Sequence, residues 1–169
     1  MAKKVLIPIV LVLLCACGGS KPAAVFSLVS EDLTDNGSMD PVFTCDGGNI
    51  TPDLKWSGAP AGTKSFVLTL RDPDAPGGDF LHWAVADIPA GTTGHPRGAK
   101  LSQAAREFKN AAGTIGYFGP CPPSGTHRYV FTLYALSAEK FSGDPAGLQD
   151  FINGHTLGKA VLTGLYTRK

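Results

Sequence analysis

Glycine and proline interrupt this sequence at short intervals, and this limits what the chain can fold into. The 169 residues include 21 Gly and 13 Pro, so about one residue in five disfavours the interior of a regular helix. Both types cluster in turn-rich stretches at 46–49, 57–60, 72–78 and 119–123. This pattern excludes a helical bundle or a coiled coil. We expect one domain, at 25–169, built from short elements joined by turns.

Three apolar segments have the composition and spacing of β-strands. Residues 66–70 (FVLTL) alternate, so that Phe66, Leu68 and Leu70 share one face. Strands are also predicted at 81–86 (LHWAVA) and at 128–135 (RYVFTLYA). Weaker strands are predicted at 25–29 and within 158–167. The pattern favours a mostly antiparallel β-sandwich with a few short peripheral helices.

Helices are predicted at three places. Residues 101–112 (LSQAAREFKNAA) have good local helix propensity and predict a helix on an inserted loop. Asp144 and Pro145 are typical of an N-cap and a first helical residue, and this helix is expected to stop at 153–154. A short helix is predicted over 156–162, where it overlaps the last strand.

The first 24 residues have the features of an export signal followed by a tether. A short basic start precedes an apolar run at 5–16, which is too short to cross a bilayer but fits the core of a signal peptide. The run ends in Leu14-Cys15-Ala16-Cys17-Gly18, which resembles the lipobox of bacterial lipoproteins. The resemblance implies that residues 1–16 are removed, that Cys17 is acylated, for example with palmitate, and that 17–24 form a flexible tether. The alternatives are an ordinary signal peptide and a buried N-terminal helix.

The lipidated form would be held in the bacterial envelope. Gly18 follows Cys17, where an Asp would signal retention in the inner membrane, so the outer membrane facing the periplasm is favoured in a diderm source. In such an oxidising compartment the remaining pair, Cys45 and Cys121, suggests a disulfide.

Charge and cysteine content narrow the classes of partner. The formal net charge is +1, so the chain has no basic excess and nucleic acid is not an expected partner. The sequence contains no CxxC motif and no Cys/His array typical of zinc. We expect no cofactor.

Titratable side chains follow the apolar faces of two predicted strands. Beyond residues 66–70, the next positions at the same two-residue spacing are Asp72 and Asp74. The face of the third strand leads backward through Tyr129 to His127. Because side chains on one face recur every second residue, these polar groups are expected at the ends of two inner faces.

The second strand permits two arrangements, with either His82 or Trp83 on the inner face. With His82 inward, two His, two Asp and one Tyr gather at one rim and line a ligand pocket. The carboxylates are then expected to raise the pKa of the imidazoles. Structural roles are the alternative: turn caps for the aspartates, satisfied hydrogen bonds for the histidines and the core for Trp83. His95 and His155 are predicted to lie in loops or at the surface, without a role.

These residues lie in motifs that resemble the phosphatidylethanolamine-binding protein family. Residues 72–76 (DPDAP) followed by 82–83 (HW) resemble the first family signature. Residues 116–123 (GYFGPCPP) and 125–129 (GTHRY) resemble the second. Residues 45–56 (CDGGNITPDLKW) are similar to the bacterial branch, often called Raf-kinase-inhibitor-like. The three motifs occur in the expected order over nearly all of the folded part.

The resemblance implies a β-sandwich with a small pocket at one end, which in the family takes phosphate or phosphorylated head groups. This sequence departs from many eukaryotic members by Cys121 in place of Gly, by the long segment at 100–112 and by a short C-terminal helix. Carried over by motif, the implied ligand-binding residues are Asp72, Asp74, His82, Gly119, Cys121, Pro122, His127 and Tyr129.

The leading functional hypothesis is a non-enzymatic, envelope-anchored protein that binds a small phosphorylated or anionic ligand. The second is an inhibitor or regulator of a partner protein, such as a protease or a kinase. The third is a hydrolase with His82 or His127 as general base, although the sequence has no G-x-S-x-G motif. A metal site built from two Asp and two His is a further alternative.

Overall fold

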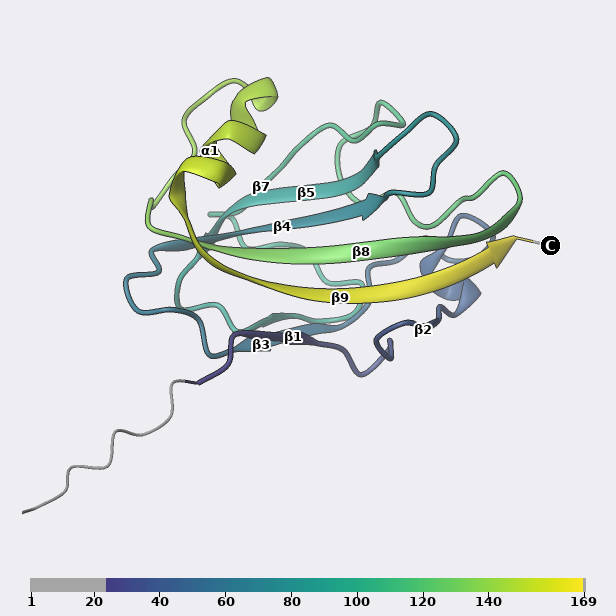
Figure 1. Cartoon of the computed structure of the whole chain (residues 1–169), viewed down its shortest axis with the longest axis horizontal. Coiled ribbons are helices and arrows are strands. Elements are labelled where there is room, and N and C mark those ends of the chain that lie inside the picture. Colours follow the sequence, from purple (N-terminus) through teal and green to yellow (C-terminus); the bar gives the residue numbers. More distant parts are fainter. Residues whose placement is uncertain (1–23, 169) are drawn as a thin grey trace, which may run out of the picture.

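The computed structural model describes residues 24–168, which form two β-sheets packed face to face (Figure 1). The smaller sheet contains, in spatial order, β1 (Ser27–Val29), β3 (Leu54–Ser57) and β6 (Gly94–His95). The larger sheet contains, in spatial order, β2 (Gly37–Ser38), β9 (Thr156–Arg168), β8 (Gly125–Leu136), β4 (Ser65–Asp72), β5 (Phe80–Pro89) and β7 (Arg106–Glu107). Neighbouring strands are antiparallel, except for the short parallel pair of β2 and β9. The predicted β-sandwich is confirmed.

The predicted strands at 66–70, 81–86 and 128–135 are confirmed as parts of β4, β5 and β8, and β1 lies within 25–29. The inner faces of the two sheets enclose the main core, to which β4 and β8 each contribute every second side chain. The large sheet contributes Phe66, Leu68, Leu70, Trp83, Val85, Phe131 and Leu133, and the small sheet contributes Leu28, Leu54 and Trp56.

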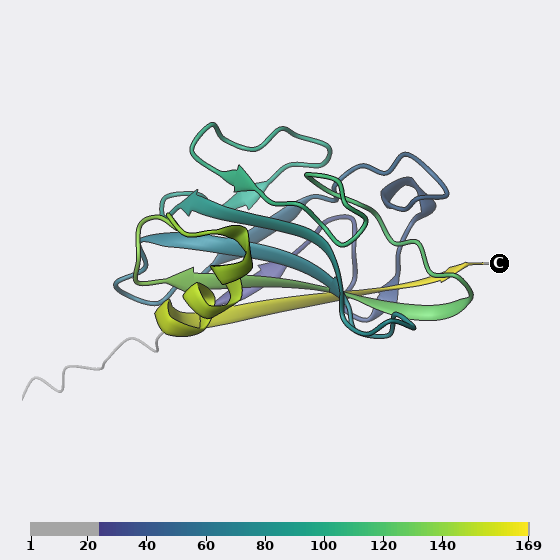
Figure 2. The ribbon, with the colours of Figure 1, turned by 90° about the horizontal axis from the view of Figure 1, so that it is seen from above.

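Helix α1 (Leu148–His155) covers part of the outer face of the large sheet and is seen from a second direction in Figure 2. A second core lies between this helix and the sheet. A 3₁₀ turn, η2 (Pro145–Gly147), precedes α1, and the Asp144 carboxylate caps it by accepting from the Ala146 amide. The capping prediction is confirmed, whereas the helix ends at His155 instead of at 153–154. This second core contains Val67, Ala84, Ala86, Phe108, Leu136, Phe141, Leu148 and Ile152.

The helix predicted over 101–112 is wrong. In its place the chain forms a loop and the short edge strand β7, in which Arg106 and Glu107 pair with Ala86 and Val85 of β5. Glu107 accepts a hydrogen bond from the Trp83 indole at 2.7 Å, and the next residue, Phe108, is buried in the second core. These tertiary contacts override the local helix propensity of the segment.

The helix predicted over 156–162 is also wrong, because β9 begins at Thr156 and pairs with β8 along its whole length. Ala160 and Leu162 are buried, whereas Val161 between them is exposed, which is the period of a strand. The overlapping prediction of a closing strand within 158–167 is therefore the correct one.

The predicted signal and lipidation site, residues 1–16 and Cys17, lie outside the described residues. Within residues 24–168, the structure has no helix with the length and hydropathy needed to cross a membrane.

Candidate ligand-binding pocket

A β-bulge in β5 decides which way His82 faces. Leu70 lies opposite Trp83 and Arg71 lies opposite Leu81, so His82 is an extra residue with no partner on β4. Trp83 consequently enters the sandwich core, while the ring of His82 reaches the ring of Tyr129 at a centroid distance of 5.2 Å. The bulge therefore gives both residues places on the inner side, where a regular strand would admit only one.

Asp72, the last residue of β4, and His127 of β8 form a buried pair at the same end of the sandwich. The Nδ1 atom of His127 lies 2.7 Å from the Asp72 Oδ2 atom, and only 3% of Asp72 and 7% of His127 are exposed. The Asp72 Oδ1 atom also accepts from the Asp74 amide at 2.8 Å. Because Nδ1–H donates to the carboxylate, the opposite nitrogen, Nε2, is left for a ligand.

His82 is fixed in the same way by a different acceptor. Its Nδ1–H donates to the Phe118 carbonyl at 2.7 Å, and its ring contacts those of Phe80 and Phe118, at centroid distances of 4.7 and 5.5 Å. Burial lowers the pKa of His82 and outweighs the opposing effect of the Asp72 carboxylate. The expectation that nearby carboxylates raise the pKa is thus wrong for His82, and the neutral form offers Nε2 as a hydrogen-bond acceptor.

A cavity of 220 Å³ opens beside these side chains. Its wall is mainly apolar, and the rings of Phe80 and Phe118 are its largest aromatic surfaces. The lining residues are Asp72, Ala75, Pro76, Gly77, Phe80, His82, Phe118, Cys121 and Pro123.

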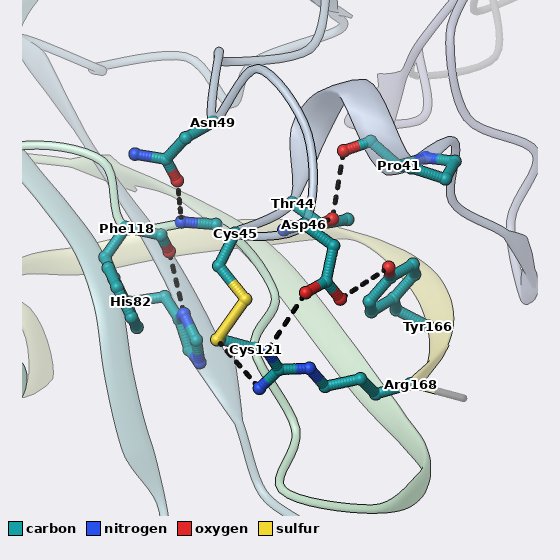
Figure 3. The surroundings of a disulfide bond; sticks show 11 residues. Pro41, Thr44, Cys45, Asp46, Asn49, His82, Phe118, Cys121, Tyr166 and Arg168 are labelled. Carbon is teal, nitrogen blue, oxygen red and sulfur yellow. Dashed lines mark hydrogen bonds and ion pairs between the residues drawn. A yellow bond between two sulfur atoms is a disulfide. The ribbon is translucent and has the colours of Figure 1, made fainter.

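A disulfide between Cys45 and Cys121 holds the loop that forms one wall of this cavity (Figure 3). The Cα atoms of the two cysteines are 5.4 Å apart, and the Cys45 amide donates to the Pro120 carbonyl. Next to it, the Gly119 amide donates to the Asn49 side chain at 2.7 Å. The disulfide and these bonds fix the peptide that presents the Phe118 carbonyl to His82.

Gly119 has a structural reason in this loop. A Cβ atom at this position would lie 2.4 Å from the Phe43 carbonyl oxygen and 2.8 Å from the Asn49 Oδ1 atom, so only glycine permits the close approach. Pro122 is buried nearby without lining the cavity. These two predicted ligand-binding residues therefore shape the loop instead of forming the wall.

The predicted site residues separate into three positions. Asp72, His82 and Cys121 line the cavity, and His127 bonds to Asp72 without lining the cavity itself. Asp74 instead pairs with Arg128 at 2.6 Å on the rim, and this guanidinium holds the pKa of the Asp74 carboxyl well below its usual range.

Tyr129 is fully buried and does not line the cavity. Burial raises the pKa of its hydroxyl, which has no hydrogen-bond partner within residues 24–168. Its ring supports the ring of His82, so its contribution to the pocket is to position that imidazole.

Three residues near the pocket carry features that strand parity could not reveal. The rings of Phe80 and Phe118 contact that of His82. Arg168, at the end of β9, places a guanidinium nitrogen 3.7 Å from the Cys121 sulfur (Figure 3). Arg168 also pairs with Asp46 at 3.1 Å. A cation thus stands beside the disulfide.

The prediction that His95 lies at the surface is wrong. His95 is buried in β6, and its Nε2 atom lies 2.8 Å from the Thr51 hydroxyl. Burial lowers the pKa of His95. It is a structural histidine, and it does not line the pocket.

No group of three or more His, Cys, Asp or Glu side chains in the part of the chain described here is placed to hold a metal ion. Two of the four residues considered for such a site, Asp72 and Asp74, have their carboxylates bonded to His127 and Arg128.

Two of the buried histidines, His82 and His95, predict that the fold is less stable in mild acid. In the unfolded chain their pKa is near the ordinary value of about 6.5, whereas burial lowers the pKa of His82 and His95 in the fold. Below about pH 6.5 the unfolded state therefore binds more protons, and each histidine lowers the free energy of unfolding by at most about 1.4 kcal/mol per pH unit.

Urea unfolding between pH 7.5 and pH 5 measures this loss. The variants His82→Gln and His95→Gln should each flatten the profile, and His155→Gln, in α1, is the control that should retain it. Stability that stays constant or increases on acidification would contradict this assignment.

Comparison with known proteins places these features in a family. The sequence profile described as "Phosphatidylethanolamine-binding protein" matches residues 29–167. A UPF0098 protein of Methanothermobacter thermautotrophicus is 42% identical over 149 residues, which cover 84% of this chain and 99% of that protein. LppC of Mycobacterium tuberculosis, which carries a provisional lipoprotein designation, is 42% identical over 118 residues, or 68% of this chain and 58% of LppC.

Solved structures agree with the sequence comparison. The crystal structure of Escherichia coli YbcL, described as a new member of the mammalian PEBP family, has a TM-score of 0.81 at 36% identity and covers 86% of this chain and 100% of that one. A PEBP homologue from Chlamydia trachomatis, CT736, has a TM-score of 0.77 at 32% identity, covering 85% and 98%. This chain belongs to the phosphatidylethanolamine-binding protein family.

Proposed function

We propose that this protein is a non-enzymatic binding protein whose pocket takes a small phosphorylated or otherwise anionic ligand. The observation that carries the proposal is the orientation of two imidazoles: that of His82, on the cavity wall, and that of His127, which bonds to the wall residue Asp72. The Nδ1 atoms of His82 and His127 are both occupied by acceptors of the protein, so both Nε2 atoms are available to the ligand. Two such nitrogens, which accept hydrogen bonds while the imidazoles are neutral, suit a group that carries O–H donors, such as a protonated phosphate.

The buried carboxylate of Asp72 refines the charge of the ligand. A fully ionised phosphate would meet repulsion from this carboxylate, whereas a singly protonated phosphate can donate its P–OH hydrogen to a neutral imidazole. The burial that lowers the pKa of His82 favours this arrangement. The ligand therefore arrives with a proton, or the imidazole takes one up on binding.

The aromatic wall suits a zwitterionic head group. Phe80 and Phe118 line the cavity, and the faces of such rings attract an ammonium group. A cavity of 220 Å³ is smaller than the roughly 300–1,000 Å³ of sites for drug-sized ligands. We therefore favour a phosphate or a phosphoethanolamine-sized group over a whole phospholipid with its acyl chains.

The composition of the cavity wall supports binding over hydrolysis. Among the described residues that line it there is no serine or threonine, and the sulfur of Cys121 is in the disulfide. A covalent mechanism needs an activated nucleophile within hydrogen-bond reach of a base.

Attachment to the cell envelope through Cys17 is the second part of the proposal. It rests on the lipobox-like sequence at 14–18 and on the provisional lipoprotein designation of the relative LppC. Labelling of the full chain with radioactive palmitate should mark the wild type and not the variant Cys17→Ser. Equal labelling of both, or none in either, would contradict attachment at this residue.

A titration of the imidazoles by ¹⁵N NMR tests the pocket. Millimolar phosphate or phosphoethanolamine is expected to shift the Nε2 resonances of His82 and His127, because both nitrogens gain a partner. His155 lies on α1 and His95 is bonded to Thr51, so both serve as controls within the same spectra.

The expected shifts should be larger at pH 6 than at pH 8, since the ligand and a proton bind together. Unchanged resonances of His82 and His127, or equal changes in all four histidines, would refute the proposed binding role.

A further inference from the structure

A second cavity lies on the opposite face of the large sheet, between the sheet and helix α1. Its volume is 160 Å³, and it shares no lining residue with the histidine pocket. Apolar side chains of β5, of α1 and of the segment after β7 form most of its wall: Leu81, Ala84, Phe108, Leu148 and Ile152. Apolar cavities of about 150 Å³ are large enough for a benzene ring.

One buried polar group in this cavity has no partner. Thr69 of β4 lines the cavity and is 2% exposed, and its hydroxyl makes no hydrogen bond within residues 24–168. Its cross-strand neighbours are Ala84 and Thr132. A buried hydroxyl without a partner destabilises a fold, so its presence at the wall of a cavity points to a ligand that supplies the partner.

The charged residues of the cavity lining are both cationic. Arg71, which shares the face of Thr69 because it lies two residues along β4, and the exposed Lys109 both line the cavity. No Asp or Glu is among the lining residues, although Arg71 pairs with Asp79 at 2.7 Å outside them. An anionic group is therefore favoured at this end.

We propose that this cavity is a second binding site, for a small aromatic carboxylate. The ring lies against Ala84 and Ile152, the carboxylate lies near Arg71 and Lys109, and a hydroxyl on the ring can bond to Thr69. This site is independent of the histidine pocket and of the ligand proposed for it.

The test is a titration of the full chain, labelled at its methyl groups, with benzoate, 4-hydroxybenzoate and benzylamine. Both carboxylates should shift the methyl resonances of Ala84 and Ile152, and 4-hydroxybenzoate should bind about threefold to tenfold more tightly because it reaches the Thr69 hydroxyl. Benzylamine, which has the same ring and the opposite charge, should not bind. The imidazole resonances of His82 and His127 should stay unchanged at the concentrations that saturate this site.

Three variants separate a ligand site from a packing defect. Thr69→Val should abolish the preference for 4-hydroxybenzoate and raise the midpoint of thermal unfolding by about 3 °C, because the unpaired hydroxyl is removed. Lys109→Gln, at an exposed position, should weaken the binding of both benzoate and 4-hydroxybenzoate. Ala146→Phe, at an exposed lining residue of η2, should block the binding of both carboxylates.

Absence of methyl shifts at 10 mM benzoate, equal binding of benzylamine, or an unchanged preference in Thr69→Val would overturn the proposal and leave a water-filled gap. Loss of these effects together with a normal response of His82 and His127 to phosphate would refute the second site alone.

Discussion

Removal of the Cys45–Cys121 disulfide is expected to lower the free energy of unfolding by about 4 kcal/mol. The bond joins residues 76 positions apart, and closing a loop of this length removes a large conformational entropy from the unfolded chain. The chain-entropy relation gives about 4.5 kcal/mol for such a loop. The double variant Cys45→Ser/Cys121→Ser, compared with the oxidised protein by urea unfolding, measures the loss without leaving a single reactive thiol.

The same change is expected to weaken the pocket. The disulfide fixes the loop whose Phe118 carbonyl orients His82, so this imidazole should lose its preferred direction while remaining in place. Phosphate affinity should fall in the double variant, and Cys45→Ala/Cys121→Ala should behave alike if the cross-link, and not the serine hydroxyls, is responsible. A loss of stability below about 1 kcal/mol with unchanged affinity would contradict this role of the disulfide.

The variant Asp72→Ala is expected to lose about 3 kcal/mol of stability and at least tenfold in phosphate affinity. Removing one partner of a buried pair costs about 3–5 kcal/mol, because the other partner stays buried without its hydrogen bond. Here the unpaired group would be the Nδ1 atom of His127, whose orientation then no longer directs Nε2 to the ligand.

The neighbouring aspartate provides a matched control. Asp74 lies two residues away in the same turn, but its partner Arg128 is on the exposed rim, where an ion pair contributes little. Asp74→Ala should therefore change stability less than Asp72→Ala and leave phosphate affinity unchanged. Asp72→Asn, which keeps an acceptor for His127, should retain part of both properties. Equal effects of Asp72→Ala and Asp74→Ala would exclude a special role for the buried pair.

Local sequence patterns were sufficient for the central strands of the sandwich. In β4 and β8 the buried residues of the inner face recur at every second position, so parity correctly carried this face forward to Asp72 and back to His127. Asp72 and His127 belong to neighbouring strands, and they lie close together because β4 pairs with β8 in antiparallel fashion.

The position of His82 could not be predicted in this way. Its place depends on a bulge, which is a property of how β5 pairs with β4 and not of the β5 sequence alone. The pKa of His82 depends on burial by Phe80 and Phe118, and Phe118 comes from a loop far along the chain. Tertiary pairing likewise decided the segment at 101–112, where an edge strand replaced the predicted helix.

A crystal structure of the protein grown at high phosphate concentration tests the central claim most directly. We predict a phosphate group in the 220 Å³ cavity, with oxygen atoms within about 3 Å of the Nε2 atoms of both His82 and His127. Phosphate bound only at the surface arginines Arg128 and Arg168, with this cavity holding none, would contradict the claim.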